Sequence, residues 1–403
     1  MGNLPLPLKK GYKFRIYPTD DQRVFLEKTF GSCRYVYNKA LADAKETYRK
    51  FVEELEKGVV GRDSSPKISG YNFVLQATIY RNDPETPWLK DVSSCALQQS
   101  MLNLGKAYAR FFREKNGFPN FKRKIGRQSF TLTDKYFHLK DEGLVLARLD
   151  SPVKICFHRK LPSKPSSVVI SRTPSRKYYA SFICEYYPEK TSDIGTVGLD
   201  AGITALVTTS TGEKVENIRA TKIYAARLRR AQQSLARKQK GSRNRYKSII
   251  RIATLHERIA NARNDHLHKL SRRLVNENQI IGMEALLVSN MVRNRHLAKH
   301  IQDASWRRLR TMLEYKVVES QHATLVLMDT FFPSSHLCSV TGKRLDRKLD
   351  LRERTWQCLH CGQLHDRDIN AAINIANEAF AVVRQRSYGE TAGKIVRSNA
   401  YRT

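Results

Sequence analysis

Apolar and polar residues alternate through residues 8–17, which predicts a β-strand at the start of the chain. Thr19 and Gln22 follow with the three-residue spacing of a capping box, which predicts a helix start. Apolar residues then continue at helical spacing as far as Phe30. The chain is therefore expected to open with one strand and one helix.

Two further stretches, around residues 33–57 and 94–114, carry apolar residues at three- and four-residue spacing and are predicted helices. The pattern then changes to short alternating runs at 153–157, 168–171 and 178–186, separated by Pro, Ser and Lys. Such runs are typical of an antiparallel barrel or sandwich. We expect the first strand to join that barrel, with the helices as an insertion.

A second domain is predicted in the later part of the chain. Its strands are expected at 196–199 and 203–208, after Gly212, and at 279–283 and 323–328. A long helical segment precedes the fourth strand, and a helix separates the fourth from the fifth. Three successive strands, then helix, strand, helix and strand, is the order of a ribonuclease H-like sheet with helices packed on it.

The long helical segment, residues 219–273, contains 17 Lys and Arg but only two acids, Glu257 and Asp265. Apolar stripes on either side of a break at 240–244 predict an antiparallel helical hairpin with a basic outer face. Such a face can simply be solvated. The imbalance is too large for pairing within the segment, however, and favours contact with nucleic-acid phosphates.

Composition supports a folded, nucleic-acid-binding protein. The 403 residues include 72 Lys and Arg against 38 Asp and Glu, a formal net charge of +34, so a polyanion is the first partner to expect. A ribosomal or histone-like protein can carry such a charge, but 41% hydrophobic residues favour a folded catalytic core. No run of about twenty apolar residues predicts a membrane span. Seven cysteines, four of them isolated, predict a reducing, intracellular setting without disulfides; the four are Cys33, Cys95, Cys156 and Cys184.

Three separate stretches each place one carboxylate at the end of an apolar strand or the start of a helix: Asp200, Glu284 and Asp368. A carboxylate beside a core must be paired, hydrated or bound to metal, so three that converge predict a Mg²⁺ site. Each also has a structural alternative, as a turn residue, an ordinary loop residue and a helix N-terminal acid, respectively. Asp366 and Asp329 rank below them as candidates.

The stretch from Gly198 to Gly202 also resembles the first phosphate loop of sugar kinases and actin-like ATPases. Those proteins need a second phosphate loop and a glycine-rich adenosine site, and the sequence shows neither. It also lacks a Walker-type phosphate-binding motif. An activity driven by nucleotide binding and hydrolysis is therefore not expected.

Cys358 and Cys361 form a Cys-x2-Cys pair followed by a turn glycine, the usual half of a zinc ribbon. The upstream half has Cys338, but Thr341 stands where a second cysteine is expected. The fourth thiolate is therefore missing. Either the site has lost its metal and is held by packing, or zinc recruits a nearby histidine, for which the candidates are His336, His360 and His365.

The order of these motifs resembles the TnpB (OrfB) family of transposon-encoded nucleases, which are relatives of the type V CRISPR effectors. The resemblance spans nearly the whole chain, and Thr341 is its principal departure. It is carried by Phe14-Arg-Ile-Tyr-Pro18, Arg34-Tyr-Val-Tyr-Asn38, Gly117-Phe-Pro-Asn-Phe-Lys122, Gly198-Leu-Asp200-Ala-Gly-Ile203, His266-Leu-His-Lys-Leu-Ser271, Gly282-Met-Glu284, Phe332-Pro-Ser-Ser335, Cys338, Cys358-x2-Cys361 and His365-Asp-Arg-Asp368-x-Asn370-Ala-Ala372.

The resemblance implies an α/β multidomain protein with an N-terminal wedge β-barrel and a C-terminal RuvC, or ribonuclease H-like, nuclease domain. The implied boundaries are 1–18 and 117–190 for the barrel, 19–116 for a helical recognition domain, 191–330 and 366–381 for the nuclease with its basic hairpin at 217–275, 331–365 for a zinc-ribbon-like, target nucleic acid-binding knuckle, and 382–403 for a flexible tail.

The implied activity is RNA-guided cleavage of double-stranded DNA beside a short transposon-associated motif. Asp200, Glu284 and Asp368 would hold two Mg²⁺ ions, for which Mn²⁺ can substitute, and the cysteines would hold Zn²⁺. The implied partners are a guide RNA from the transposon end and the target DNA. A monomer with one RNA, acting at the nucleoid in a prokaryotic cytoplasm without membrane contact, is expected.

Several further residues are candidates for nucleic-acid contact. Gln98 and Thr131 match the positions with which the family reads the adjacent motif; without the resemblance they are a helix-surface amide and a strand hydroxyl. Phe118 and Phe121 interleave with cations in a way suited to stacking, although both rings can equally anchor a loop. The basic candidates are Lys122, Arg123, Lys124, Lys238, Lys240, Arg243 and Arg245.

Two alternative functions remain open at the level of sequence. One is an RNA-guided DNA-binding regulator with an inactive nuclease, against which the three intact acids argue. The other is an RNA-binding accessory protein in transposition that needs no guide.

Overall fold

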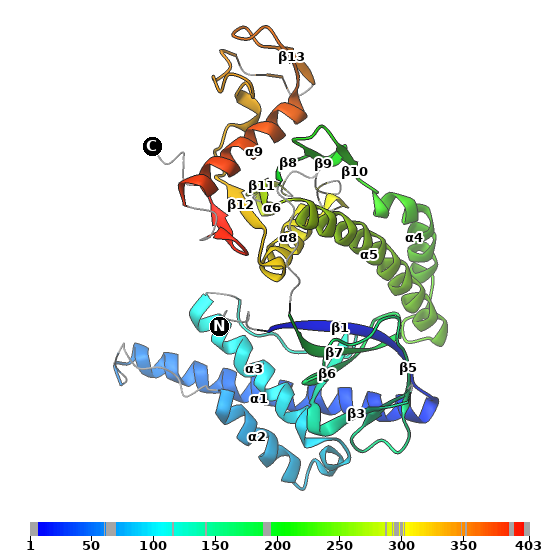
Figure 1. The fold of residues 1–403 in the computed structure, drawn as a ribbon. Coiled ribbons are helices and arrows are strands. Elements are labelled where there is room, and N and C mark those ends of the chain that lie inside the picture. The colour runs from blue at the N-terminus through cyan, green and yellow to red at the C-terminus, as the bar shows by residue number, and fades with distance from the viewer. Residues whose placement is uncertain are drawn as a thin grey trace. The chain divides into compact units, whose positions relative to one another are not determined.

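A computed structural model describes residues 7–59, 61, 70–114, 117–141, 143–187, 195–286, 288–291, 293, 298, 301, 303–347, 349–350, 353–386 and 391–398. The chain divides into two compact units, residues 1–187 and 188–403 (Figure 1).

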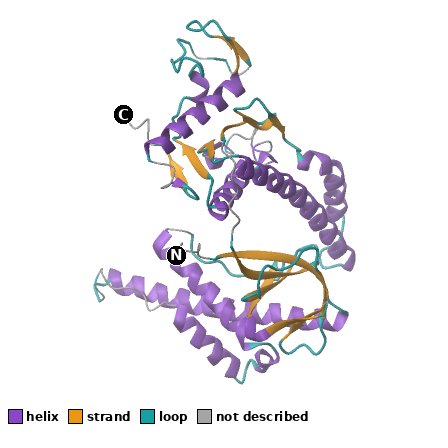
Figure 2. Ribbon diagram, viewed as in Figure 1, coloured by secondary structure: helices purple, strands orange, loops and turns teal. Residues whose placement is uncertain are grey.

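The first unit contains a seven-stranded, wholly antiparallel sheet, drawn in orange in Figure 2. Its order is β2-β6-β7-β1-β5-β4-β3, and the two edge strands β2 and β3 follow each other in the chain, so the sheet curls into a nearly closed barrel. The expected antiparallel barrel, with the first strand of the chain as one of its members, is confirmed. The strands are β1 (Leu8–Tyr17), β2 (Gln128–Thr133), β3 (Phe137–Lys140), β4 (Gly143–Leu146), β5 (Val153–Cys156), β6 (Ser167–Arg172) and β7 (Tyr178–Tyr186). The sequence patterns did not predict β2, β3 or β4.

Three long helices accompany this sheet: α1 (Asp20–Glu56), α2 (Gly70–Asn82) and α3 (Ser94–Glu114). The predicted capping box is present, since Thr19 and Gln22 bond each other reciprocally. The predicted interruption near residues 30–33 is wrong, because α1 runs through Gly31 without a break. One buried stripe from Leu26 to Ala44 continues across this glycine, and its packing outweighs the roughly 1 kcal/mol helix cost of glycine.

The helices and the barrel share one hydrophobic core. Phe30 of α1 packs on Phe130 of β2 with ring centroids 5.3 Å apart. The buried Arg172 of β6 forms an ion pair with Glu27 of α1. The predicted barrel (1–18 and 117–190) and recognition domain (19–116) are therefore two sections of one packed unit.

The second unit contains a six-stranded sheet of order β10-β9-β8-β11-β12-β15. The first three strands are antiparallel, and β8, β11, β12 and β15 are parallel. The strands are β8 (Thr196–Ala201), β9 (Ala205–Thr209), β10 (Lys214–Glu216), β11 (Ile280–Glu284), β12 (Thr324–Met328) and β15 (Ile395–Arg397). The five strands predicted in this part of the chain are all present, and they follow one another along the chain in the predicted order.

The sixth strand, β15, corrects one expectation. It lies in the 382–403 segment predicted to be a flexible tail, yet residues 395–397 pair with β12 and Val396 is buried. Helix α9 also extends to Gln385. Backbone pairing with a buried parallel strand holds this short segment in place.

Helices cover both faces of the sheet. Val197, Leu199 and Met283 belong to a core shared with α5 (Arg243–Glu277) and α8 (Trp306–Ser320). Ile280 and Met328 belong to a second core shared with α9 (Arg367–Gln385). Since neighbouring residues of a strand point to opposite faces, even-numbered positions of β8 and β11 face α9.

The predicted basic hairpin is formed by α4 (Ala220–Ala236) and α5, which pack side by side. The connection from Arg237 to Ser242 contains Gly241 with φ +85°. A short helix α6 (Val288–Met291) follows β11. Within the described residues, no helix is both long enough and apolar enough to cross a membrane.

Residues 331–365 form a small subregion with its own apolar centre. Two short strands, β13 (Thr355–Gln357) and β14 (Leu364–Asp366), pair antiparallel. Cys338, Leu349, Trp356 and Cys358 are buried together. β14 leads directly into α9, so this subregion ends where the helix begins.

Candidate functional site

Asp200 and Glu284 stand side by side at the carboxyl ends of two neighbouring parallel strands. Gly198 pairs with Gly282, and Leu199 pairs with Met283, in the register of β8 and β11. The acids follow the glycines by two residues, so all four positions lie on the face that α9 covers. Both acidic side chains therefore point toward the same side of the sheet.

The two glycines let α9 approach the sheet closely. A Cβ atom on Gly198 would lie 1.9 Å from the carbonyl oxygen of Ala372, and one on Gly282 would lie 2.8 Å from that of Ile375. No side chain fits at the first position, so the helix backbone rests directly on the strand. This contact brings the first turn of α9, which carries Asp368, toward the strand ends.

The three acids lie close enough for their charges to interact. Burial raises the pKa of Asp200 most, the charges of Glu284 and Asp368 raise it further, and Arg367 and Arg354 oppose the rise, leaving it at about 8. Burial also raises the pKa of Glu284, against a hydrogen bond from the Ser334 hydroxyl of 2.8 Å. Half-buried carboxylates that repel one another are the arrangement a cation relieves.

Asp368 is oriented by its surroundings. Arg354 lies 3.3 Å from Oδ1 of Asp368. Asp366 is the N-cap of α9, where its Oδ1 accepts hydrogen bonds from the amides of Asp368 and Ile369 at 3.0 and 3.1 Å. Lys214 donates to the other oxygen of Asp366 at 2.7 Å. Asp366 is therefore committed to the helix start, and Asp329 accepts a bond from the amide of Phe331 in a turn.

A second cluster lies just before α9. One ligand atom from each of Cys338, Cys358, Cys361 and His365 lies within 4.8 Å of the others. Burial raises the pKa of the Cys338 thiol, but hydrogen bonds from Thr341 and Val340 outweigh it and lower the pKa to about 6. Of the three candidate histidines, only His365 joins this group, while His360 lies 3.8 Å from Asp346.

The motif-reading candidates lie at one contact of the first unit. Cys95 of α3 meets Thr133 of β2, with Sγ 3.5 Å from Oγ1. Gln98 follows Cys95 by nearly one helical turn, and Thr131 precedes Thr133 by one strand repeat. Both are half-buried, and the elements that carry them, α3 and β2, pack on each other.

The 118–124 segment mixes anchors with exposed cations. Phe118 packs on Tyr48, Tyr108 and Phe111, which is the loop-anchor alternative. Phe121 is exposed beneath the ammonium of Lys45. Taken as a whole, the Lys122 residue is exposed. Its ammonium group, however, lies 3.9 Å from the centre of the Tyr37 ring, and burial of this group lowers the pKa of Lys122. Arg123 and Lys124 are exposed.

Among the hairpin candidates, Arg245 is occupied by local structure. Its guanidinium donates to the carbonyls of Leu235 and Lys238, closing the connection between the helices. Lys238, Lys240 and Arg243 are exposed in or beside that connection.

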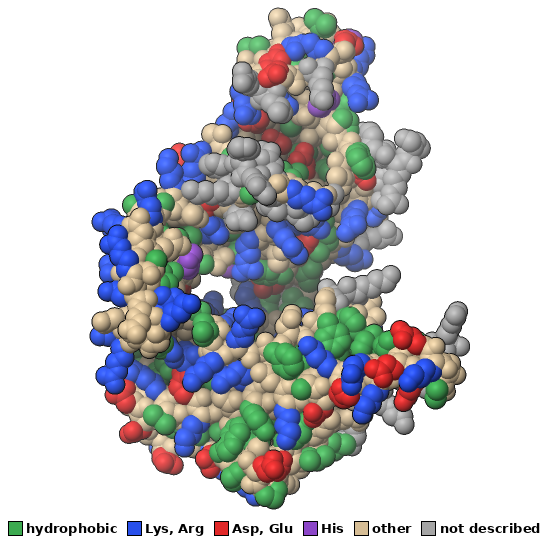
Figure 3. Space-filling model, turned by 180° about the vertical axis from the view of Figure 1, so that it is seen from behind, with side chains coloured by type: hydrophobic (Ala, Val, Ile, Leu, Met, Phe, Trp, Pro, Cys, Tyr) green, Lys and Arg blue, Asp and Glu red, His purple; other side chains and the backbone are tan. Residues whose placement is uncertain are grey.

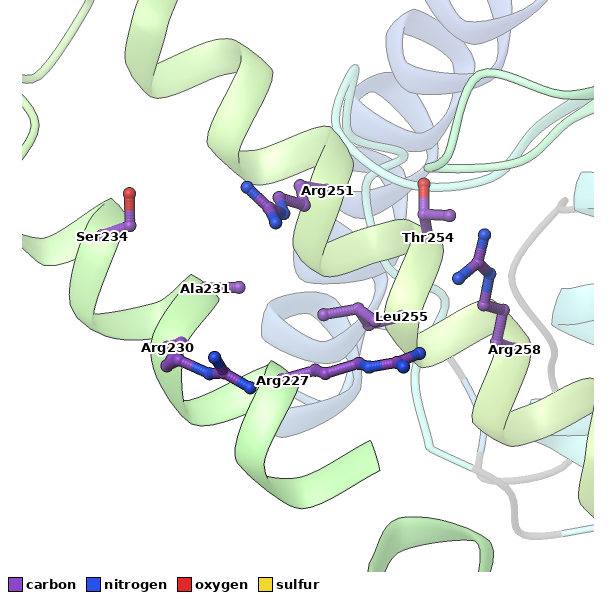
Figure 4. A pocket seen from close by; sticks show the side chains of 8 residues that line it. All are labelled: Arg227, Arg230, Ala231, Ser234, Arg251, Thr254, Leu255 and Arg258. Carbon is purple, nitrogen blue, oxygen red and sulfur yellow. The ribbon is translucent and has the colours of Figure 1, made fainter. Parts of the chain in front are cut away.

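Sequence reasoning missed a basic pocket between α4 and α5. Four arginines line a cavity of about 580 Å³, two from each helix, and none pairs with a carboxylate of the described chain. Figure 4 shows Arg227 and Arg230 on α4 with Arg251 and Arg258 on α5. Lys and Arg also gather on the outer surface of the hairpin (Figure 3). The signal available in sequence was the local excess of positive charge.

Family models match three parts of the chain. Residues 173–295 match the OrfB_IS605 model, described as "Probable transposase", and residues 306–375 match a Cas12f1-like TNB domain. Residues 8–51 match the associated helix-turn-helix domain. In the structure this last segment is β1 and most of the continuous α1, not two helices joined by a turn.

Curated relatives cover nearly the whole chain. A Streptomyces pristinaespiralis protein named "Putative RNA-guided DNA endonuclease" is 40% identical over 93% of this chain and 90% of its own length. InsQ of Escherichia coli K12, named in the same way, is 28% identical over 93% of both chains. A solved Cas12f1-sgRNA-target DNA complex shares the fold, with a TM-score of 0.56 at 11% identity, over 92% of this chain and 99% of its own.

Fold and site together define a mixed α/β protein with acidic residues at the carboxyl ends of two neighbouring strands, β8 and β11, and a cysteine cluster just before α9. The chain belongs to the TnpB (OrfB) family, which confirms the resemblance seen in its motifs.

Proposed function

We propose that this protein is a transposon-encoded, RNA-guided endonuclease that cleaves double-stranded DNA at a guide-complementary target beside a short motif. The observation that supports this most directly is the position of Asp200 and Glu284 at the ends of paired parallel strands, where the charges of Glu284 and Asp368 add to burial in raising the pKa of Asp200. The names of the close relatives support it independently. The sheet with α9 across it is the RuvC-like nuclease core in this proposal.

The acidic site fits a hard divalent cation. Its donors are carboxylate oxygens, which Mg²⁺ and Mn²⁺ prefer. When bound, two such ions would supply an activated water molecule and stabilisation of the departing oxygen for phosphodiester hydrolysis. Asp200, Glu284 and Asp368 are the residues that would hold them.

The protein's own residues arrange this chemistry. Ser334 holds one oxygen of Glu284, and Asp366 holds the helix start that carries Asp368. Arg354 contributes a positive charge beside Asp368, where a phosphate of the scissile strand would lie. Gly198 keeps α9 against β8 and so fixes the distance between the acids.

Nucleic-acid binding is assigned to the basic surfaces. In this proposal the hairpin arginines and the basic residues at 122–124 contact backbone phosphates, and Gln98 with Thr131 reads the motif beside the target. Base pairing with the guide supplies the remaining specificity, so the protein needs few base contacts of its own. The functional unit in this proposal is a cytoplasmic monomer with one guide RNA.

The test is a plasmid-cleavage assay with the full chain purified together with RNA transcribed from its flanking locus. The plasmid carries a guide-matched target next to a randomised sequence. We expect Mg²⁺-dependent cuts beside one enriched motif, no cuts in EDTA, and none with an unmatched target. Guided binding without cuts would overturn the proposal in favour of an inactive regulator.

A matched pair of variants ties the activity to the site. Asp200→Asn should abolish cleavage while leaving RNA affinity nearly unchanged, because this acid contacts no phosphate. Asp329→Asn removes one negative charge from a turn near the sheet edge and should cleave normally. Equal loss in both variants would contradict the assignment of Asp200.

A further inference from the structure

The cysteine segment contains two matching knuckles, one of which lacks a sulfur. Gly342 donates its amide to the carbonyl of Cys338, and Gly362 donates to that of Cys358, each at 2.8 Å. Both glycines have φ +70°. The turns are therefore the same, and Thr341 occupies the position that Cys361 occupies in the second knuckle. Its hydroxyl accepts a bond from the amide of Lys343 instead.

Four potential ligand atoms nevertheless lie together, and three of them have the spacing of a tetrahedral zinc site. With bond lengths of about 2.3 Å to sulfur and 2.0–2.1 Å to nitrogen, a tetrahedron has edges of about 3.8 Å between sulfurs and 3.6 Å between sulfur and nitrogen. Cys338 Sγ lies 3.7 Å from Cys361 Sγ, and Nε2 of His365 lies 3.5 and 3.8 Å from those two sulfurs. All four ligand atoms lie within 4.8 Å of one another.

His365 is held in this position by its neighbours. It pairs with Trp356 across β13 and β14, and the two rings stack with centroids 4.6 Å apart. Its side chain is 7% exposed. The imidazole therefore cannot swing out to water without leaving the small core, and its Nε2 already points at the thiols.

We propose that Cys338, Cys358, Cys361 and His365 form a Cys3His zinc site in which the histidine replaces the missing sulfur, and that bound zinc fixes the start of α9 and thereby the position of Asp368. The zinc assignment stands by itself. Its consequence for cleavage rests on the proposed function.

The link to Asp368 follows from the place of His365 in the chain. His365 lies in β14 one residue before Asp366, the N-cap that holds the amide of Asp368. A fourth ligand at position 341 would connect the metal to the two knuckles alone. A ligand at 365 connects the metal to the strand that enters α9.

The helix is also attached to the first knuckle, by side-chain amides. Asn370 accepts from the amide of Ser339 and donates to the carbonyl of Leu337, at 2.8 and 2.7 Å. Asn374 donates to the same carbonyl of Leu337 at 2.8 Å. The first turns of α9 are thus held by hydrogen bonds on one side and by the metal ligand on the other.

The first experiment measures the metal itself in the full chain purified with its RNA. We expect about one zinc per chain by elemental analysis and an X-ray absorption spectrum with three sulfur neighbours and one nitrogen. His365→Ala should weaken zinc binding by more than about 100-fold, since losing even an outer-shell partner costs about 10–100-fold. His360→Ala, a neighbouring histidine outside the cluster, should bind normally. A wild-type protein without zinc, or with zinc unaffected by His365→Ala, overturns the site.

The second experiment separates metal binding from its effect on α9. The double variant Thr341→Cys/His365→Ala should bind zinc through four sulfurs, which also shows that it folds. Hydrogen exchange at the amides of residues 368–370 is measured with and without a zinc chelator. Chelation should speed exchange in the wild type and have little effect in the double variant. Equal responses in the two proteins contradict the coupling of zinc to Asp368.

The rate of DNA cleavage provides a third test, which depends on the proposed function. The zinc-loaded double variant should cleave more slowly than the wild type, because its metal no longer holds the β14–α9 junction. Full wild-type cleavage in that variant counts against the coupling. If the wild type itself never cleaves, the proposed function fails, whereas the zinc and exchange results still decide this inference.

Discussion

The hydroxyl of Ser334 donates a 2.8 Å hydrogen bond to Oε1 of Glu284 and so joins the turn after β12 to the acid at the end of β11. This bond lowers the pKa of Glu284 against the effect of burial. It therefore favours the ionised carboxylate that a cation requires.

Ser334→Ala should reduce the cleavage rate by about tenfold at saturating Mg²⁺, which corresponds to the lower end of the energy of a hydrogen bond to a charged group. Ser335→Ala is the matched control, since its hydroxyl lies 3.2 Å from His336 Nδ1 and not at the acid. Single-turnover cleavage measures both. An equal decrease in the two variants would show that Ser334 acts only through the turn.

Gly198→Ala should destabilise the second unit strongly. The added methyl group would lie 1.9 Å from the carbonyl oxygen of Ala372, so α9 must move off the strand. Overpacking of this kind costs about 1–3 kcal/mol or more. Gly11→Ala is the control, because a methyl at this strand glycine would lie 3.8 Å from its nearest neighbour, Ile183. Thermal unfolding should show a lower Tm for the first variant and an unchanged or slightly higher Tm for the second.

The arginine pocket between α4 and α5 should contribute to RNA affinity. The double variant Arg227→Gln/Arg251→Gln should weaken binding and reduce the slope of log K against log salt by about one to two, because two phosphate contacts are lost. The control is Arg49→Gln/Arg347→Gln, which removes the same charge from arginines paired with Glu46 and Glu353. Filter binding across a salt series measures both. Identical slopes in the two double variants would mean that only net charge matters.

Two cysteines of the first unit should react very differently with an alkylating reagent. Cys156 is exposed, whereas Cys33 is buried and burial raises its pKa to about 12. Cys33 therefore stays a neutral thiol at pH 8 and is shielded from solvent. Mass spectrometry after brief alkylation should find Cys156 modified, and Cys33 modified only after denaturation. Early modification of Cys33 in the folded protein would contradict the shared core of α1 and the barrel.

Strands of the second unit's sheet could be predicted where they are mainly apolar runs that end at a charged or turn residue. β8 and β11 are of this kind, and their terminal acids mark the site. β15 could not be predicted, because a three-residue strand has too little pattern and forms only by pairing with β12. The unbroken α1 was also missed, because the helical pattern was divided near residues 30–33 although the buried stripe continues across them.

The site itself was only partly visible in sequence. The three acids follow from their positions after strands and at a helix start. The choice among His336, His360 and His365 does not, because it depends on how β13 pairs with β14. The arginines of the α4–α5 pocket are likewise brought together only by helix packing, although the charge excess of their segment was clear.

The close contact between α9 and β8 also sets the time at which a nascent chain can complete its acidic cluster. The ribosome makes β8 and β11 first, and the surface around Gly198 and Gly282 stays uncovered until α9 emerges. The last parallel strand arrives later still, with residues 395–397. A polypeptide whose translation stops before Asp368 carries two of the three acids at most. Under the proposed function, chains that end before Asp368 therefore lack the complete acidic site, even if their first unit has already folded.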